Sequence, residues 1–458
     1  MAPMFLDCSD QIAGNEPRLS NGIAVTDVDS DGAFEVVVAG YGTDNLVLKW
    51  DGKKLRNVAD PVIADPLRKA MAVATADMDG DGREEIYILN ADCGGQGEET
   101  CDRLFASFGN RWLDLLSQPE NAAAANRLPG RSVAAIDREG RGRYGFVIAT
   151  EGAPLRLYEL SRRGRLIDTA EEAGIDLIGL GRGLICLPLF GEHMDIVAVN
   201  EAGPNFLFRN LGDGTFEEIA GERGIADSRN AARGVAVLDA DGDGLLDLLI
   251  GNWEGPHRLY QHRSGGGFVD VANADLSLPS RVRTVITADF DNDGYEELFF
   301  NNFGEPNRLF AWRDDQWIEV DLGDAAEPRG FGTGATIVDL DGDGRLELLI
   351  GHGEAEAQPL SFYRTLPNGN RWLRVQPLTA YGAPARGAVV TCVARGRRQK
   401  RVICSGSGYL CQMEPVAHFG LGNTDAVERV EVHWPDGMAA IIDAPPINRV
   451  LTVPYPPE

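Results

Sequence analysis

The sequence predicts an all-β protein, a seven-bladed β-propeller followed by a small C-terminal β-sandwich or barrel. The main observation is an acidic segment that recurs with its first aspartate at positions 27, 77, 239, 289 and 339, so that three of the intervals are 50 residues long. Short apolar runs with alternating polarity flank each recurrence, which is typical of strands. The chain also has 55 Gly and 24 Pro among 458 residues, a composition that favours frequent turns.

The long interval between Asp77 and Asp239 leaves room for two further units. The first keeps a degraded acidic segment, from Asp137 to Gly145, and the second, around residues 184–196, keeps only its apolar runs. A unit of about 50 residues with four short strands, present seven times, is typical of a β-propeller. A parallel solenoid is the alternative, but its repeats are usually shorter and lack the hairpin expected at residues 206–216.

The strands of a unit are expected in a fixed order. In the fifth unit, residues 234–238 lead into the acidic segment, residues 246–250 leave it and residues 258–261 alternate in polarity. In the last unit, the hairpin strand at residues 360–364 has no strand after it. Its unpaired equivalent is Phe5 to Cys8, so we expect the N-terminus to complete the last blade, because an open ring would expose strand edges.

The repeat stops after Arg364, which divides the chain. We expect the propeller to occupy residues 1–366 and a separate β module to occupy residues 367–458. Alternating polarity predicts strands in this module at residues 372–375, 388–393, 400–404, 427–434, 439–443 and 450–455.

The recurring segments have the composition of calcium loops. Positions 1, 3, 5 and 9 carry carboxylates, a glycine at position 6 permits a sharp turn, and the carbonyl of position 7 can complete the shell of a hard cation. A polar turn without metal is the alternative, but carboxylates gathered within a few ångströms repel strongly unless a cation binds. We therefore predict about five Ca²⁺ ions. The predicted ligands are Asp27, Asp29, Asp31, Glu35, Asp77, Asp79, Asp81, Glu85, Asp239, Asp241, Asp243, Asp247, Asp289, Asp291, Asp293, Glu297, Asp339, Asp341, Asp343 and Glu347.

The degraded third loop is expected to hold no ion. Arg141 stands at its position 5 and Gly145 at its position 9, so a guanidinium is expected to replace the cation. Whether Asp137 and Glu139 retain any metal is left open.

Charge and motif content exclude several classes of function. Seventy acidic against 43 basic residues give a net charge of −27, so no nucleic-acid partner is expected. No apolar run approaches the roughly 18 residues of a membrane span, and the start of the chain lacks the features of a secretory signal. The seven Cys form no C-x-x-C pair and the six His form no H-E-x-x-H motif, which argues against zinc ribbons and zinc proteases.

Two groups of motifs resemble known families. The acidic loops with the following elements Gly255 to Leu259 and Gly304 to Leu309 resemble the FG-GAP repeats of integrin α-subunits. The segments Gly406 to Gly422 and Val430 to Gly437 resemble the ASPIC/UnbV domain, and together the motifs resemble the cartilage acidic protein family across essentially the whole chain. The resemblance implies an extracellular, calcium-binding, non-enzymatic protein. The EGF-like module of the longer animal forms and any N-x-S/T sequon are missing, which a bacterial-type member would explain.

Four further features each have two interpretations. The basic cluster Arg395, Arg397, Arg398, Lys400 and Arg401 is expected to be a solvated hairpin, with docking on the acidic propeller or an anionic glycan as the alternative. His418 is expected to be a hydrogen-bonded structural residue rather than a ligand. Cys93 and Cys101 can form a disulfide in an oxidising compartment. Aromatic and histidine side chains after the loop strands are expected to pack in the blades, with a surface rim as the alternative: Tyr41, Trp253, His257 and Phe303.

The functional prediction is a calcium-loaded binding or adhesion protein that recognises a protein or glycan at a surface, acts as a monomer and is not an enzyme. By resemblance it is secreted or located at the cell surface. A propeller enzyme acting on polysaccharide is the first rival, although no paired carboxylates with a nucleophile or base occur outside the loops. A cytoplasmic scaffold is the second.

Overall fold

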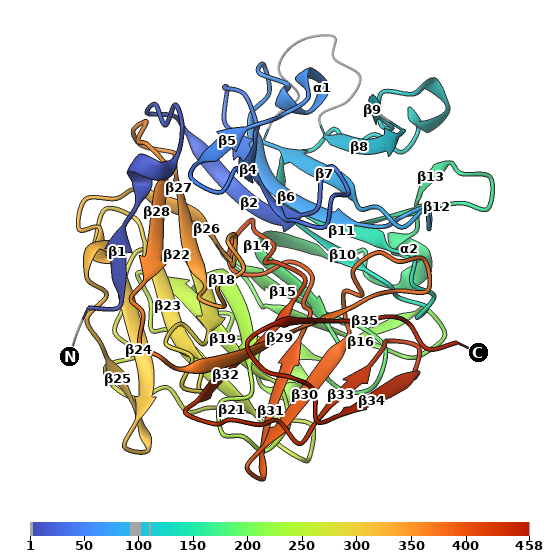
Figure 1. Ribbon diagram of the computed structural model, residues 1–458. Coiled ribbons are helices and arrows are strands. Elements are labelled where there is room, and N and C mark those ends of the chain that lie inside the picture. Colours follow the sequence, from blue (N-terminus) through green and yellow to red (C-terminus); the bar gives the residue numbers. More distant parts are fainter. Residues whose placement is uncertain (1–2, 92–101, 110, 458) are drawn as a thin grey trace.

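A computed structural model describes residues 3–91, 102–109 and 111–457 of the chain. The fold is all-β, as predicted, and in the described residues the strands form seven four-stranded antiparallel units arranged in a ring (Figure 1). Two neighbouring units are joined into one eight-stranded sheet by a pairing between their strands. A further pair of sheets follows at the C-terminus.

The innermost strands surround the axis of the ring. They are β2 (Ser20–Thr26), β6 (Ala70–Ala76), β10 (Gly130–Ile136), β14 (Ile178–Leu187), β18 (Ala231–Leu238), β22 (Val282–Ala288) and β26 (Gly332–Val338). Each contacts the innermost strand of the next unit, and β26 contacts β2, so the ring is closed. These strands consist mainly of small and branched apolar residues because they pack on both faces and have almost no exposed side.

Three more strands complete each blade outward. The second strands are β3 (Glu35–Gly40), β7 (Glu85–Asn90), β11 (Gly145–Pro154), β15 (Asp195–Asn200), β19 (Asp247–Trp253), β23 (Glu297–Asn302) and β27 (Glu347–His352). The third strands are β4 (Leu46–Trp50), β8 (Arg103–Phe108), β12 (Arg156–Leu160), β16 (Phe206–Asn210), β20 (Arg258–His262), β24 (Arg308–Arg313) and β28 (Ser361–Thr365). The outer strands are β5 (Leu55–Asn57), β9 (Arg111–Asp114), β13 (Leu166–Asp168), β17 (Phe216–Glu218), β21 (Phe268–Asp270), β25 (Gln316–Glu319) and, for the last blade, β1 (Phe5–Asp7).

The position of β1 confirms the predicted ring closure. It pairs antiparallel with β28, with Phe5 opposite Thr365 and Asp7 opposite Tyr363. Phe5 is fully buried, and its ring lies 5.0 Å from the ring of Phe290 in the neighbouring blade. The N-terminus therefore both completes the last blade and packs against the adjacent one.

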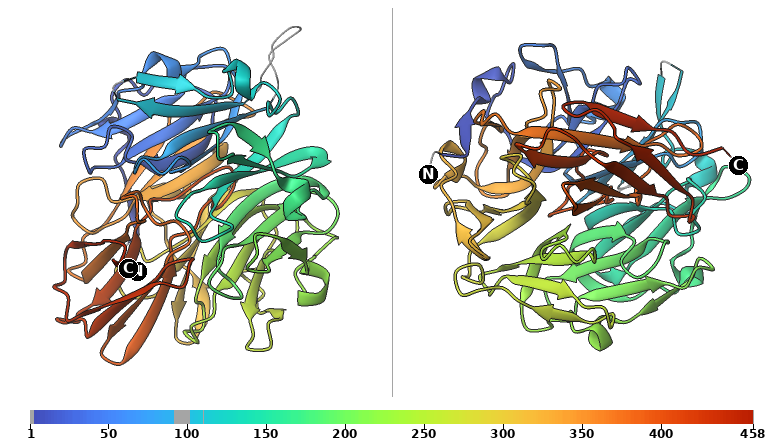
Figure 2. Two further views of the ribbon diagram at one scale, coloured as in Figure 1. Left: turned by 90° about the vertical axis from the view of Figure 1, so that its right-hand side faces the viewer. Right: turned by 60° about the horizontal axis from the view of Figure 1, so that its bottom comes forward.

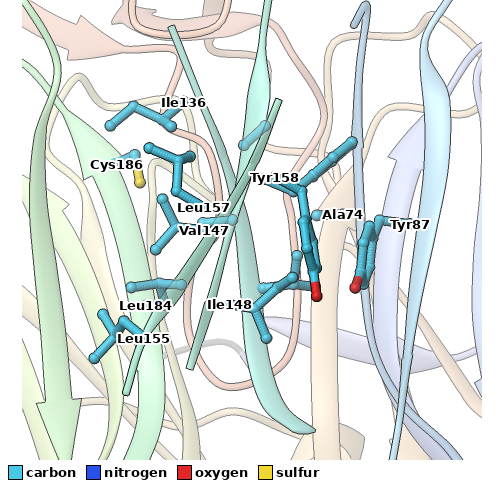
Figure 3. Close-up of a cluster of buried hydrophobic side chains, with 14 of the residues drawn as sticks. Ala74, Tyr87, Ile136, Val147, Ile148, Leu155, Leu157, Tyr158, Leu184 and Cys186 are labelled. Atoms are coloured by element: carbon cyan, nitrogen blue, oxygen red, sulfur yellow. The ribbon is translucent and has the colours of Figure 1, made fainter. Parts of the chain in front are cut away.

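The core lies between the blades. Figure 3 shows one such region, where side chains from the second, third and fourth blades meet. Tyr87 and Tyr158 stack there with ring centroids 6.3 Å apart. The remaining elements are single turns: α1 (Pro61–Ala64), α2 (Ala170–Ala173), α3 (Ala220–Arg223), η1 (Ser9–Gln11), η2 (Pro119–Asn121) and η3 (Asp324–Ala326). Among the residues with described positions, no helix is long and apolar enough to cross a membrane.

The C-terminal module is a two-sheet β-sandwich. One sheet contains β29 (Arg371–Pro377), β32 (Ala417–Gly422) and β35 (Val450–Val453). The other contains β30 (Val389–Ala394), β31 (Arg397–Val402), β33 (Arg429–His433) and β34 (Ala439–Asp443). Side chains from both sheets share one apolar core. The module lies across one face of the ring (Figure 2).

Residues 405–413 of this module enter the axis of the propeller, and we call them the axial plug. Backbone hydrogen bonds join the plug to four innermost strands: the N–H of Cys186 to Ser405 (2.8 Å), of Val235 to Gly408 (3.0 Å), of Val73 to Leu410 (3.3 Å) and of Val25 to Gln412 (3.2 Å). Side-chain bonds add the other three innermost strands through Ala135, Thr284 and Thr336. The plug therefore contacts all seven blades, a connection that the expectation of a separate module did not include.

Candidate metal centres

The predicted acidic loops connect the innermost strand to the second strand in five blades, at the end of the ring that the module covers. In each loop at least three carboxylates place oxygen atoms within 4.8 Å of one another. The converging groups are Asp27, Asp29 and Glu35; Asp77, Asp79 and Glu85; Asp239, Asp241 and Asp243; Asp289, Asp291 and Glu297; and Asp339, Asp341 and Asp343. Within each of the five loops, the structure therefore brings three of the four predicted ligands together. The fourth predicted ligand of each loop is not in its converging group: Asp31, Asp81, Asp247, Asp293 and Glu347.

The backbone turn of each loop is held by its first aspartate. The carboxylate accepts the N–H of the glycine at position 6, with distances of 2.9 Å from Gly32 to Asp27 and 3.0 Å from Gly344 to Asp339. These glycines have positive φ angles, +89° and +79°, which side-chain-bearing residues rarely adopt. The first aspartate and the glycine of the Asp-x-Asp-x-Asp-Gly order therefore fix the turn, and the aspartates at positions 1 and 3 converge in all five loops.

The acid at position 9 begins the second strand, and in the first, second and sixth blades it is one of the three converging acids. One of its oxygens accepts the N–H of the second loop residue, as from Val28 to Glu35 (2.8 Å) and from Phe290 to Glu297 (2.9 Å). Among the described residues, the other oxygen of Glu297, Oε1, is buried without a hydrogen-bond partner, with the guanidinium of Arg313 3.6 Å away, and Oδ1 of Asp289 is also buried without a partner. A buried anionic oxygen without a partner is costly, and a cation bound among these oxygens would compensate for it.

Burial also raises the pKa of these carboxyl groups. The pKa rises to about 9 for Glu85, to about 8 for Asp289 and to about 7 for Glu35 and Asp247, in each case mainly through desolvation. Repulsion from neighbouring loop aspartates acts in the same direction. The folded protein therefore gathers acids that water would keep ionised, which is the electrostatic environment that favours a divalent cation.

Three loops also have a basic side chain from the third strand of the same blade, which the sequence analysis did not identify. The ammonium group of Lys49 lies 2.6 Å from Asp29 and 3.0 Å from Glu35. Arg313 pairs with Asp291 at 2.6 Å in the sixth blade, and Arg364 pairs with Asp341 at 2.6 Å in the seventh. The only sequence signal was a basic residue at the last or next-to-last position of the third strand, which looks like an ordinary strand end.

In the third loop, the position of the Arg141 side chain differs from the one expected from the sequence. Asp137 is held by backbone N–H groups, from Arg141 at 2.9 Å and from Gly142 at 2.6 Å. The guanidinium of Arg141 pairs with Glu139 at 2.9 Å but is 70% exposed. The guanidinium therefore pairs with one acid of the loop at the surface and is not buried in the place of a cation, while Asp137 accepts the same kind of backbone N–H bonds as the first aspartate of the intact loops.

The basic cluster of the module docks on the propeller, contrary to the favoured expectation of a solvated hairpin. Arg397 donates to the carbonyl of Gly294 (2.8 Å), Lys400 donates to the carbonyl of Gly244, and Arg401 pairs with Glu296 (3.2 Å). Arg398 instead pairs with Glu431 inside the module. The alternative of docking on the acidic propeller is therefore correct for three of the five basic residues.

Other module groups contact the loop acids directly. The N–H of Gly420 donates to Asp289 at 3.0 Å, and Arg374 pairs with Asp339 at 2.9 Å. His418 lies 2.6 Å from the side-chain oxygen of Asn292, and burial lowers its pKa well below the usual range. His418 is thus a buried, hydrogen-bonded structural residue, as predicted.

The structure describes five of the seven cysteines. Cys93 and Cys101 lie outside the described residues. Five cysteines within the described ranges are free thiols: Cys8, Cys186, Cys392, Cys404 and Cys411.

Two known protein families match this sequence. The family ASPIC and UnbV matches residues 379–458, and the FG-GAP-like repeat matches residues 27–88, 192–250, 239–300 and 289–350. The fold and the acidic loops therefore define an FG-GAP-type propeller with a C-terminal ASPIC/UnbV module. The chain is 46% identical to human cartilage acidic protein 1 over 99% of its own length and 76% of the relative, and 45% identical to the Xenopus tropicalis protein over 100% and 77%. It belongs to the cartilage acidic protein family.

Solved structures support the fold alone. A lectin, BP39L from Burkholderia pseudomallei, aligns with a TM-score of 0.51 at 14% identity, covering 75% of this chain and 99% of the lectin. An ancestral GH74 enzyme aligns with a TM-score of 0.51 at 12% identity, covering 80% of this chain and 51% of the enzyme.

Proposed function

We propose that this protein is a calcium-loaded, non-enzymatic binding protein of the extracellular type, which recognises a protein or glycan through the surface of its propeller. The observation that carries the proposal is the convergence of carboxylates in five loops, with buried oxygens of Asp289 and Glu297 that have no hydrogen-bond partner in the described part of the chain. Family membership supports the same function.

About five Ca²⁺ ions would bind, one in each intact loop. The carboxylates at positions 1, 3, 5 and 9 would hold the ion, and the backbone carbonyl at position 7 would complete an all-oxygen shell. Calcium accepts such irregular shells of six to eight oxygens, whereas magnesium requires a near-ideal octahedron. The bound ion would neutralise the loop carboxylates and fix the start of each second strand.

The axial plug argues against the rival polysaccharide-degrading enzyme. A propeller enzyme needs an open site with paired carboxylates, yet residues 405–413 fill the axis and bond to the innermost strands. The loop end of the ring is in turn covered by the module through Arg397 and Gly420. The acids gathered at that end serve the loops and their contacts with the module.

Location follows from the affinity expected of such loops. Extracellular calcium modules bind with Kd values of about 10⁻⁴ to 10⁻³ M. Such sites fill at the calcium concentration outside cells and stay empty in cytosol. We therefore propose a secreted or cell-surface protein that acts as a monomer, and a cytoplasmic scaffold becomes the alternative if the loops bind far more tightly.

A binding assay tests the function. The full chain, loaded with calcium, is applied to arrays of matrix proteins, cell-surface ectodomains and glycans, and the assay is repeated with chelator. Saturable binding that is lost with chelator supports the proposal. As a control, the protein is assayed on a panel of polysaccharide and ester substrates. Turnover that is lost when an acidic residue outside the loops is mutated would overturn the proposed non-enzymatic function.

A further inference from the structure

A cluster of arginines lies at the end of the axis opposite the acidic loops. Each innermost strand has an irregularity near its start, where its pairing with the second strand skips one or two residues. The residues skipped first are Asn21, Met71, Arg131, Arg182, Arg233, Arg283 and Thr333. Four consecutive blades therefore place an arginine at this position, and we call these four residues the arginine arc.

The arginine arc lies beside the tip of the axial plug. The guanidinium of Arg283 is 5.7 Å from the ring centre of Tyr409. The side chains of Arg182, Arg233 and Arg283 are nine-tenths buried, with exposed fractions of 8%, 7% and 10%. The arc thus gathers largely buried cationic side chains around the closed axis.

The arc lacks one carboxylate among the described residues. Glu151 pairs with Arg131 and lies 3.8 Å from Arg182, Glu201 is shared by Arg182 and Arg233, and Glu354 pairs with Arg283. In the ion pairs that the four arginines make themselves, four cations are therefore matched by three anions; beside them, Arg281 pairs with Glu254 and lies 3.8 Å from Glu305 at the surface.

The missing charge leaves donors without acceptors. Nε and Nη1 of Arg233 are buried without a hydrogen-bond partner in the described part of the chain, and so are Nε of Arg131 and Nε of Arg283. Burial lowers the pKa of Arg182 to about 10, and the charges of Arg233 and Arg131 act in the same direction. An oxyanion with two acceptor oxygens is the group that a guanidinium binds best, through paired N–H donors.

Aromatic side chains lie next to the arc. Trp253 lies under the guanidinium of Arg283 at 4.4 Å, and its ring is 6.0 Å from that of Phe303, which is 5.0 Å from Phe331. All three rings are partly exposed, so the alternative of a surface rim is correct for Trp253 and Phe303, whereas His257 is fully buried. A partly exposed tryptophan stacked on a largely buried arginine is typical of the residues that dominate protein–protein binding energy.

We propose that the arginine arc binds a carboxylate on an acidic side chain of a partner protein, with the neighbouring aromatic rings receiving the apolar residues beside it. The proposal rests on the proposed binding function and names its partner class. A single missing carboxylate and an apolar rim fit an acidic peptide. A polysulfated chain fits less well, because the net charge of −27 repels polyanions.

The first test supplies the missing carboxylate from within the protein. Met71 occupies the equivalent position in the blade next to Arg131, so Met71→Glu adds an anion beside the arc and Met71→Gln adds a neutral side chain of the same shape. We expect Met71→Glu to have the higher Tm of the two, by a few degrees. A Tm for Met71→Gln equal to or above that of Met71→Glu would overturn the proposal, and loss of packing common to both variants cancels in the comparison.

The second test measures recognition in the full calcium-loaded chain. Two pools of nine-residue peptides differ only in a central Asp or Asn among varied apolar residues, and binding is read from tryptophan fluorescence and anisotropy. We expect the Asp pool to bind at least tenfold more tightly than the Asn pool, with the preference lost in Arg233→Gln and Met71→Glu. It should be retained in Arg229→Gln, an exposed arginine in the loop before the same strand.

Three results would overturn the proposal: equal binding of the two pools, an Asp preference that survives in Arg233→Gln, or binding of sulfated dextran that depends on Arg233 without any peptide preference. The proposal does not require calcium in the loops. A chain that fails to bind calcium but discriminates the peptides would refute the proposed metal sites and leave the arginine arc standing.

Discussion

Arg374 of the C-terminal module and Asp339 in the acidic loop of the seventh blade form a buried ion pair, with 2.9 Å between Nη1 and Oδ2 and side chains that are 3% and 0% exposed. The same guanidinium also pairs with Glu414, just after the axial plug. One arginine thus links the module, the plug and a candidate calcium loop. This geometry makes the module an integral part of the propeller.

Replacing Arg374 tests that link. Arg374→Met leaves the carboxylates of Asp339 and Glu414 buried without their cation, so we expect the free energy of unfolding to fall by about 3–5 kcal/mol. The matched control is Arg398→Met, which removes an exposed pair with Glu431 and should cost no more than about 1 kcal/mol. Denaturant unfolding measures both, and equal losses would contradict the integral role of the module.

The axial plug contains a glycine, Gly406, beside which there is no space for a Cβ atom. Gly406 has φ +71°, and a Cβ there would clash with the carbonyl oxygen of Leu184 in the fourth blade. Gly396, at a hairpin turn, has a similar φ of +73° but open space around it. Gly406→Ala should therefore lower the Tm by several degrees more than Gly396→Ala, because the backbone strain is shared and the clash is not. Similar melting curves would mean that the plug is not held as tightly as the structure indicates.

The ring closure is tested at β1. Phe5 is fully buried between the last blade and Phe290, whereas its neighbour Leu6 is 45% exposed. We expect Phe5→Ala to cost about 3–5 kcal/mol, the usual value for a buried phenylalanine. Leu6→Ala should change stability little. Deleting residues 1–12 should in addition reduce solubility, since it uncovers the edge of β28; an unchanged melting temperature would count against the closure.

The stabilisation by calcium should depend on pH. Burial raises the pKa of Asp77 to about 6, of Glu35 and Asp247 to about 7, of Asp289 to about 8 and of Glu85 to about 9. Because these values lie above those of the unfolded chain, about 4, the metal-free folded protein holds protons in the loops that the unfolded chain releases. This contribution to its stability is fully present below about pH 4, falls as pH rises, and is gone once pH exceeds the folded pKa of each group, about 6 to 9.

Calcium needs the ionised carboxylates, so protons compete with it. The rise in Tm on adding calcium should therefore be small at about pH 5 and grow steadily toward pH 9. Paired melting curves with and without calcium at each pH measure the difference. A calcium effect that is constant over this range, or larger at low pH, would disagree with the buried geometry of the loops.

Much of this architecture could be predicted because it is local in sequence. An acidic loop contains its own carboxylates and its own turn glycine, as between Asp27 and Glu35, and the count of strands per unit left Phe5 to fill the last blade. The plug could not be predicted in this way, because its bonds join Ser405 to Cys186 and Gln412 to Val25 across hundreds of residues. Such contacts leave no periodic signal.

The arginine arc was missed for a related reason. Arg182 and Arg233 each precede a glycine in a strand that otherwise reads as apolar, and single charges there resemble ordinary strand ends. Only the closed ring shows that equivalent irregularities in successive strands bring them together. The basic hairpin was misjudged because the acceptors of Arg397 and Lys400 are backbone carbonyls, which sequence composition does not reveal.

The number of calcium ions per chain tests the central claim most directly. After equilibrium dialysis against millimolar calcium, metal analysis should return about five ions per chain, and the Asp241→Ala variant should return one fewer. With Kd values of about 10⁻⁴ M, millimolar calcium would stabilise each site by roughly 1.4 kcal/mol, so chelator should lower the Tm by many degrees. A count of about two ions or fewer in the wild-type chain, with a Tm that chelator does not change, would contradict the account.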